Sequence, residues 1–148
     1  MPDEQVQPRI VVGVDGSDPS KEALRWAARI GVAIGARIEA VTAWEYPTSY
    51  GWPAYGDDWR PDADADAVLR ETLDQVFGDD RPAGLEARVC HGHARQVLLD
   101  TADGTAMLVV GSRGHGGFTG LLLGSVSSAC AEHAHCPVLV VHQRDTTS

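Results

Sequence analysis

Residues 109–128 read VVGSRGHGGFTGLLLGSVSS, and they join an apolar, strand-like run to a glycine-rich loop and the start of a helix. Glycine is entropically costly in a folded chain, but it lets the backbone approach a ligand closely. A helix N-terminus after such a loop adds partial positive charge at the same point. The segment therefore predicts an anion-binding site around the glycines at positions 111, 114, 116, 117, 120 and 124.

The rest of the chain alternates between two hydrophobic patterns. Short β-branched and apolar runs indicate buried strands, and apolar residues at helical spacing indicate the helices between them. The predicted strands cover residues 9–14, 37–44, 85–90, 106–111 and 137–142, and the predicted helices cover residues 63–77, 94–102 and 126–135, in addition to one that starts at Asp18.

The first helix has the clearest start signal. Asp18 before Pro19 predicts Asp18 as the N-cap and proline in the first turn. An apolar stripe predicts the core-facing side of this helix, and it consists of Leu24, Ala27, Ala28, Gly31 and Val32.

Strands that alternate with helices predict an α/β fold, with a single doubly wound five-stranded parallel sheet and helices on both faces. Right-handed crossovers leave few topologies, and the order 3-2-1-4-5 is the one expected. Ligands of such sheets bind beyond the carboxyl ends of the strands where the order reverses. The loops after Val14 and Val110 would meet there. Residues 1–148 are expected to form one domain, with polar tails at 1–8 and 143–148.

Charge and composition argue against several partners. The net charge is −9, whereas nucleic acids and anionic membranes bind basic surfaces, so neither is expected as a partner. No apolar run reaches the roughly 20 residues that span a bilayer, and the first ten residues do not resemble a secretory signal. Three cysteines, at positions 90, 130 and 136, lack a framework spacing and are expected to be buried, reduced thiols in a cytoplasmic protein.

The glycine-rich region is also unusual in its charge. Residues 104–131 contain no Asp or Glu, and Arg113 is their only fixed charge. One interpretation is that this region is simply buried strand and loop. The other is a pocket that is kept free of negative charge because its ligand is an anion.

Several common motifs are absent from the sequence. Lys21 is the only lysine, which excludes G-x-x-x-x-G-K-[ST], and no G-x-G-x-x-G follows the first strand. Without G-x-S-x-G, Ser125 is a poor candidate for a nucleophile. The spacing that is present is G-x2-G-x9-G-[ST], at Gly111, Gly114 and Gly124.

With this motif the chain resembles the universal stress protein family, specifically its ATP-binding branch, over nearly its whole length. The matching segments, in order, are VVGVDGS, HGHARQVLLDTAD, LVVGSRGHGGFTGLLLGSVS and HCPVLVV. The resemblance implies that the protein binds ATP, together with Mg²⁺, and acts as a nucleotide-dependent sensor or regulator in the stress response.

Carried over by position, the resemblance places Asp15 beside the ribose and phosphates, with a role through Mg²⁺, and places the adenine beside Gly13 and Ala43. A helix-capping role for Asp15 and a solvated surface position for Arg113 are the alternatives. N-capping is likewise the alternative for the two serines at 125 and 127. The nucleotide-binding residues implied are Gly13, Val14, Asp15, Ala43, Gly111, Ser112, Arg113, Gly114, His115, Gly116, Gly117, Gly124, Ser125, Val126 and Ser127.

Two other functions compete with nucleotide sensing. One is an enzyme on the same fold that slowly hydrolyses ATP or transfers a nucleotidyl group, although no residue is assigned as catalytic. The other is a ligand-free interaction module. A regulatory protein partner is expected, but the sequence does not identify it.

Three further features have alternative interpretations. The aromatic residues of the stretch 44–61 would cover a bound base, or they would instead cover the sheet edge or pack against the second helix. The histidines at 91, 93, 133 and 135 fit no common metal-ligand spacing. The apolar strand 137–142 is predicted at a sheet edge, and an edge of this kind favours a homodimer by antiparallel strand pairing, unless another part of the same chain covers it.

Overall fold

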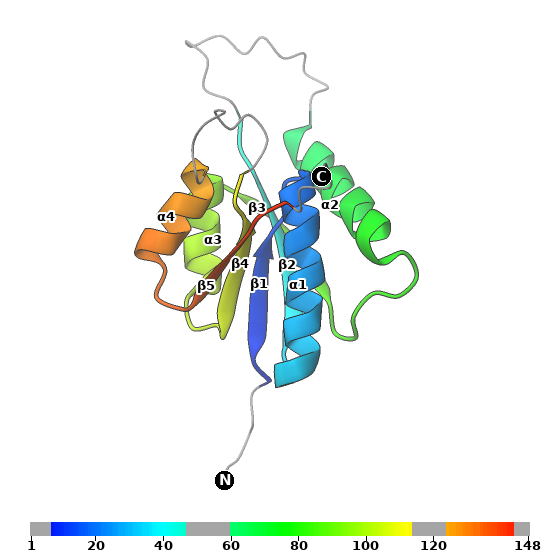
Figure 1. The fold of residues 1–148 in the computed structure, drawn as a ribbon. Coiled ribbons are helices and arrows are strands. Elements are labelled where there is room, and N and C mark those ends of the chain that lie inside the picture. Colours follow the sequence, from blue (N-terminus) through cyan, green and yellow to red (C-terminus); the bar gives the residue numbers. More distant parts are fainter. Residues whose placement is uncertain (1–6, 47–59, 114–123, 144–148) are drawn as a thin grey trace, which may run out of the picture.

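The computed structural model describes residues 7–46, 60–113 and 124–143. In these residues five parallel strands form one sheet in the order β3-β2-β1-β4-β5, which confirms the predicted fold class and strand order (Figure 1). The strands are β1 (Arg9–Gly13), β2 (Arg37–Trp44), β3 (Glu86–His91), β4 (Met107–Gly111) and β5 (Val138–Val141), and the helices are α1 (Asp18–Ile34), α2 (Pro61–Phe77), α3 (Ala94–Ala102) and α4 (Ser125–His133).

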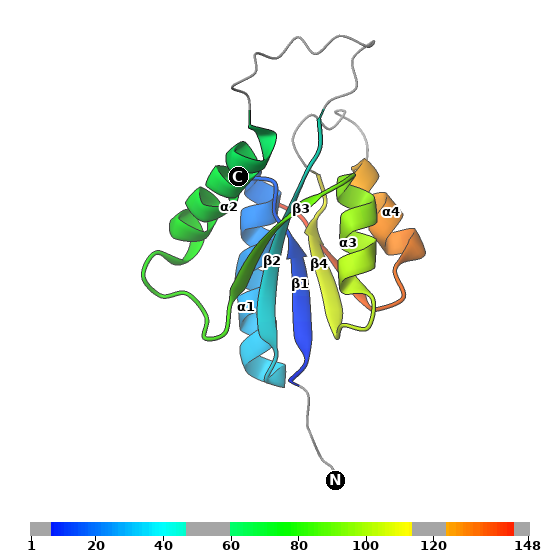
Figure 2. The ribbon, with the colours of Figure 1, turned by 180° about the vertical axis from the view of Figure 1, so that it is seen from behind.

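The helices cover both faces of the sheet, as predicted. Figures 1 and 2 show α1 and α2 on one face and α3 and α4 on the other. Because side chains of a strand alternate between faces, Ile10 and Val12 of β1 pack with α1 and α2, whereas Val11 packs with α3 and α4. The two cores are therefore separate, and the central strand contributes to both.

Helix α1 corrects two predictions. Its N-cap is Ser17 rather than Asp18, because Ser17 has extended backbone and its side chain accepts a hydrogen bond from the N–H of Ser20. Val32 is 85% exposed and does not belong to the buried stripe. The residues of α1 that face the core are Ser20, Ala23, Leu24, Ala27 and Gly31.

Helix α4 ends earlier than predicted, at His133. Ala134 has extended backbone, with φ −66° and ψ 147°. The proline at 137 restricts Cys136, so the chain straightens before β5 begins.

The cysteines are only partly as predicted. All three are free thiols, but Cys90 and Cys136 are half-buried and only Cys130 is fully buried. Burial raises the pKa of the Cys130 thiol to about 11. Cys130 packs among the side chains of the α3–α4 core.

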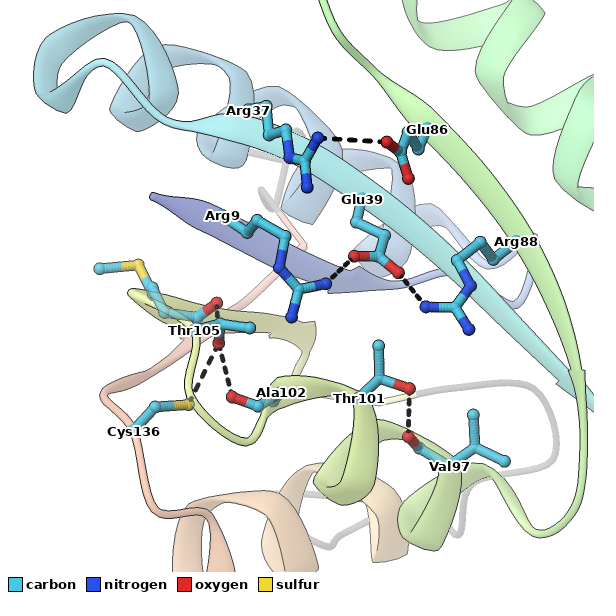
Figure 3. Close-up of polar contacts among 11 residues, drawn as sticks. Arg9, Arg37, Glu39, Glu86, Arg88, Val97, Thr101, Ala102, Thr105 and Cys136 are labelled. Carbon is cyan, nitrogen blue, oxygen red and sulfur yellow. Dashed lines mark hydrogen bonds and ion pairs between the residues drawn. The ribbon is translucent and has the colours of Figure 1, made fainter. Parts of the chain in front are cut away.

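Charged side chains cover part of the α3–α4 face, at the start of the three strands β1, β2 and β3. Figure 3 shows Glu39 of β2 between Arg9 of β1 and Arg88 of β3, with Arg37 and Glu86 beside them. Glu39 is 2% exposed, and its Oε1 accepts a hydrogen bond of 2.5 Å from Arg88. The contact with Glu39 raises the pKa of Arg88. This cluster lies at the opposite end of the sheet from the predicted site.

Candidate nucleotide site

A cavity of about 620 Å³ lies at the carboxyl ends of the strands, where β1 and β4 separate. Its walls come from the ends of β1, β2 and β4 and from the N-terminal parts of α1, α2, α3 and α4. Helices α1, α2, α3 and α4 all begin at this end of the sheet (Figure 1). The cavity is therefore where a doubly wound sheet is expected to bind its ligand.

Most of the residues predicted for the site line this cavity. Ser112 is described but is not one of the lining residues, and positions 114–117 lie outside the described residues. The predicted residues that line the cavity are Gly13, Val14, Asp15, Ala43, Gly111, Arg113, Gly124, Ser125, Val126 and Ser127.

Asp15 is held in a tight turn after β1. Its Oδ1 accepts a hydrogen bond of 3.0 Å from the N–H of Ser17 and one of 2.5 Å from the Ser17 hydroxyl. The same Ser17 side chain accepts from the N–H of Ser20, which connects Asp15 to the first turn of α1. The carboxylate is thus oriented at the cavity wall by the residue that caps the following helix.

Two glycines allow close packing under the cavity. A Cβ at Gly111 would lie 2.7 Å from Cβ and 2.8 Å from the carbonyl carbon of Pro19, so only glycine lets the end of β4 contact the start of α1. A Cβ at Gly13 would lie 2.8 Å from Cδ1 of Leu98 in α3. The packing therefore requires glycine at Gly111, where the neighbour is backbone, whereas a Cβ at Gly13 would only displace the end of the Leu98 side chain.

The first turn of α4 begins without a side-chain cap. Its N-cap residue is Gly124, and the first helical bond runs from the N–H of Ser128 to the carbonyl of Gly124 at 2.9 Å. The backbone N–H groups of Ser125, Val126 and Ser127 precede that bond, and all three residues line the cavity. Such N–H groups and the helix dipole favour an anion.

The Ser127 hydroxyl has acceptors inside the protein. It lies 2.9 Å from the carbonyl oxygen of Ser112 and 3.1 Å from that of Gly124. The N–H of Gly124 donates to the same Ser112 carbonyl at 2.7 Å, and the N–H of Ser112 donates to Val141 at 2.8 Å. The carbonyl oxygen of Ser112 therefore accepts hydrogen bonds from both Gly124 and Ser127, and these bonds connect the end of β4 to the start of α4.

The end of β2 supplies backbone groups to the cavity. The carbonyl of Val41 in β2 accepts a hydrogen bond from the N–H of Val14, on the β1 side. The carbonyl of Trp44 in β2 accepts one from the N–H of Gly92, on the β3 side. Ala43 lies two residues after Val41 and therefore directs its N–H and C=O to the β1 side. Register pairing with β1 reaches only the pair of Gly13 and Val41, so Ala43 is placed at the cavity beyond it.

Some cavity residues were missed by the sequence interpretation. Helix α2 begins at Pro61, two residues before its predicted start, and its Ala65 and Val68 form an apolar part of the wall together with Leu98 of α3. In the sequence, the helical spacing of these apolar residues indicated only that they face the hydrophobic core. No motif marks them as site residues, because their position depends on how α2 packs across β2.

The charges are divided between two sides of the cavity. Among the described lining residues, Arg113 and the start of α4 contribute no carboxylate, whereas the carboxylates of Asp15, Glu45 and Asp64 also line the cavity. The described residues of the acid-free segment that line the cavity therefore share it with three carboxylates, and the cavity as a whole is not free of negative charge. Glu45 contacts Nδ1 of His93 at 2.7 Å.

The start of α2 carries an exposed ion pair. Nε of Arg60 lies 3.2 Å from Oδ1 of Asp62, and this hydrogen bond lowers the pKa of Asp62 and raises that of Arg60. Asp62 is therefore ionised, and its negative charge is favourable in the first turn of a helix.

Within the described ranges, no three His, Cys, Asp or Glu side chains are grouped as ligands for a metal ion. The histidines considered from the sequence therefore form no such site there. None of the described helices is both long and apolar enough to cross a membrane.

Comparisons with known proteins agree on one family. The sequence model of the Universal stress protein family matches residues 8–142. Universal stress protein Rv2623 of Mycobacterium tuberculosis is 31% identical over 145 residues, which cover 93% of this chain and 48% of that protein. The chain thus spans about half the length of the curated relatives it matches.

Solved structures show the same fold. The crystal structure of a universal stress protein in complex with cAMP is 31% identical, with a TM-score of 0.68, and the match covers 95% of this chain and 100% of that one. Universal stress protein UspA from Lactobacillus plantarum is 24% identical, with a TM-score of 0.72, and the match covers 93% of this chain and 99% of that one.

Proposed function

The chain belongs to the universal stress protein family, and from that premise we propose that its cavity binds ATP and that the bound nucleotide makes the protein a sensor or regulator in the stress response. The observation that carries the proposal is the uncapped first turn of α4. The N–H groups of Ser125, Val126 and Ser127 lie at the cavity wall, where they favour phosphate oxygens. The positively charged Arg113 lines the same cavity.

The end of β2 supports adenine as the base. Ala43 presents a backbone N–H and C=O on its β1 side, and adenine offers a matching acceptor and donor at N1 and N6. Guanine has a donor at N1 and an acceptor at O6, so it would face like groups. A relative that is 31% identical was solved with cAMP, which contains the same base.

The donor set at Asp15 supports Mg²⁺ as the accompanying ion. Mg²⁺ is typically bound by one or two carboxylates together with the phosphates of the substrate, rather than by a protein cage. Asp15 is a cavity carboxylate of this kind. When bound, the ion would neutralise charge between Asp15 and the phosphates.

A homodimer through β5 is part of the proposal. β5 is an edge strand that pairs with β4 on one side, and it consists of the apolar residues Val138–Val141. An apolar edge strand favours pairing with a second chain, and a two-fold axis would pair β5 with its own copy.

Mass spectrometry of gently purified protein tests the ligand, and calorimetric titration measures its affinity. We expect co-purified adenine nucleotide, with ATP bound more tightly than GTP. The titration includes cAMP, because tighter binding of cAMP than of ATP would show that the proposed ligand is wrong. Equal affinity for GTP and ATP would contradict the assignment of Ala43 to the base.

A further inference from the structure

We infer that Ser127 is a positioning residue for the phosphate side of the cavity, and that its hydroxyl acts through the Ser112 carbonyl instead of donating to the ligand. This inference rests on the proposed function, since it concerns how ATP is held. It replaces the interpretation of the Ser127 side chain as a phosphate donor. Its backbone N–H remains part of the first turn of α4.

The hydrogen-bond geometry carries the inference. A serine hydroxyl has one proton, and here its acceptors are the carbonyl oxygens of Ser112 and Gly124, at 2.9 and 3.1 Å. Ser127 is 2% exposed, so its side chain is fixed inside the protein. The lone pairs that remain on the hydroxyl oxygen are acceptors, and a phosphate oxygen is also an acceptor. The hydroxyl therefore serves the protein and not the anion.

The acceptor, Ser112, lies at a junction of three elements. Its N–H donates to Val141 at the end of β5, and its C=O accepts from Gly124, the N-cap of α4. Ser112 directly follows β4, whose last residue, Gly111, packs closely on Pro19 at the start of α1. The bond from Ser127 thereby fixes the first turn of α4 to the rigid end of the sheet.

The Ser127 bond sets the direction of the N–H groups at the start of α4, in addition to any contribution to the stability of the protein. The N–H groups at the start of α4 favour phosphate only when they point at the place where its oxygens lie. Without the Ser127 bond, α4 keeps its packing on the sheet through Cys130 and Val126, but its first turn loses one of the two bonds that the described residues make to the Ser112 carbonyl. Affinity for the phosphates falls, whereas affinity for the base and ribose does not.

The test compares ATP with adenosine in Ser127→Ala, Ser127→Thr and Ser128→Ala by calorimetric titration. For Ser127→Ala we expect ATP affinity to fall by about fivefold to tenfold, with adenosine affinity unchanged. Ser127→Thr keeps the hydroxyl and should restore ATP binding. Ser128→Ala removes a hydroxyl from the same helix and should bind ATP as the wild type does.

Amide hydrogen exchange of the unliganded proteins provides a second measurement. We expect faster exchange at Gly124 in Ser127→Ala and not in Ser128→Ala, with β1 unchanged. Equal loss of ATP and adenosine affinity, or full ATP affinity in a folded Ser127→Ala, would overturn the inference alone. A wild-type protein that binds neither ATP nor adenosine would instead overturn the proposed function, and the inference with it.

Discussion

Ser17 donates both its backbone N–H, at 3.0 Å, and its hydroxyl, at 2.5 Å, to the Oδ1 of Asp15, while its hydroxyl oxygen accepts from the N–H of Ser20. One side chain thus caps α1 and orients the carboxylate at the cavity. We predict that Ser17→Ala lowers the free energy of unfolding by about 1–2 kcal/mol, measured by urea denaturation. The affinity for Mg²⁺ and ATP should fall as well. Unchanged stability would show that the cap contributes nothing.

Removal of Mg²⁺ should weaken ATP binding through Asp15. A carboxylate near phosphates is unfavourable without a cation, so EDTA should reduce ATP affinity by about tenfold in the wild type, as measured by titration. Asp15→Asn removes the like charge as well as the ion ligand, and its affinity should respond little to EDTA. Wild-type affinity that is insensitive to EDTA would exclude the metal role of Asp15.

The two packed glycines should differ in their tolerance of alanine. At Gly111 the new Cβ would contact the carbonyl carbon of Pro19 at 2.8 Å and the nitrogen of Ser20 at 3.0 Å, and these backbone atoms cannot move aside cheaply. At Gly13 it would contact the end of the Leu98 side chain. We predict that Gly111→Ala costs about 2–3 kcal/mol and Gly13→Ala less, by denaturation. The reverse order would contradict this account.

Glu39 and Glu86 are a matched pair of acids in the cluster of Figure 3. Glu39 is buried between Arg9 and Arg88, so Glu39→Ala should destabilise the protein by about 3 kcal/mol. Glu86 is half exposed and contacts Arg37 at 3.3 Å, so Glu86→Ala should cost less than about 1 kcal/mol. Denaturation curves measure the free energy of unfolding of the two variants, and equal decreases in the two would contradict the prediction.

The buried thiol of Cys130 predicts a dependence on pH. Its folded pKa of about 11 lies above the ordinary thiol value of 9.0, so the unfolded chain loses its proton first as the pH rises. Stability should therefore fall between about pH 9 and pH 11, by up to about 3 kcal/mol from this group. The decrease should be smaller in Cys130→Ala than in Cys90→Ala. If the free energy of unfolding falls equally with pH in the two variants, the pKa of Cys130 is not raised.

A proline in β5 tests the proposed dimer. The carbonyls of Pro137 and Val141 accept bonds from β4, so Val140, between Leu139 and Val141, directs its N–H to the open edge. Val140→Pro should therefore shift a dimer toward monomer in sedimentation, and Val140→Ala should do so much less. A wild-type protein that sediments as a monomer at micromolar concentration would exclude the dimer.

The fold could be predicted because local patterns and the sheet topology agree at every strand. The errors have local causes. Ser17 and Asp18 are both good caps, and only the hydrogen bond to Ser20 distinguishes them. Val32 has apolar character but lies on the outer side of α1.

The residues that line the cavity could be predicted where a motif marks them, as at Asp15 and Gly124, and not where tertiary packing brings them there. Ala65 and Val68 reach the cavity only because α2 crosses β2. The acceptor of the Ser127 hydroxyl likewise depends on where β4 ends relative to α4.

The central claim is that the cavity between β1 and β4 binds ATP, and calorimetric titration of the wild-type protein with ATP and Mg²⁺ tests it most directly. The account predicts saturable binding of a single nucleotide for each chain, with weaker binding of GTP and of adenosine. The claim is contradicted if folded protein that is free of co-purified nucleotide shows no saturable binding of ATP.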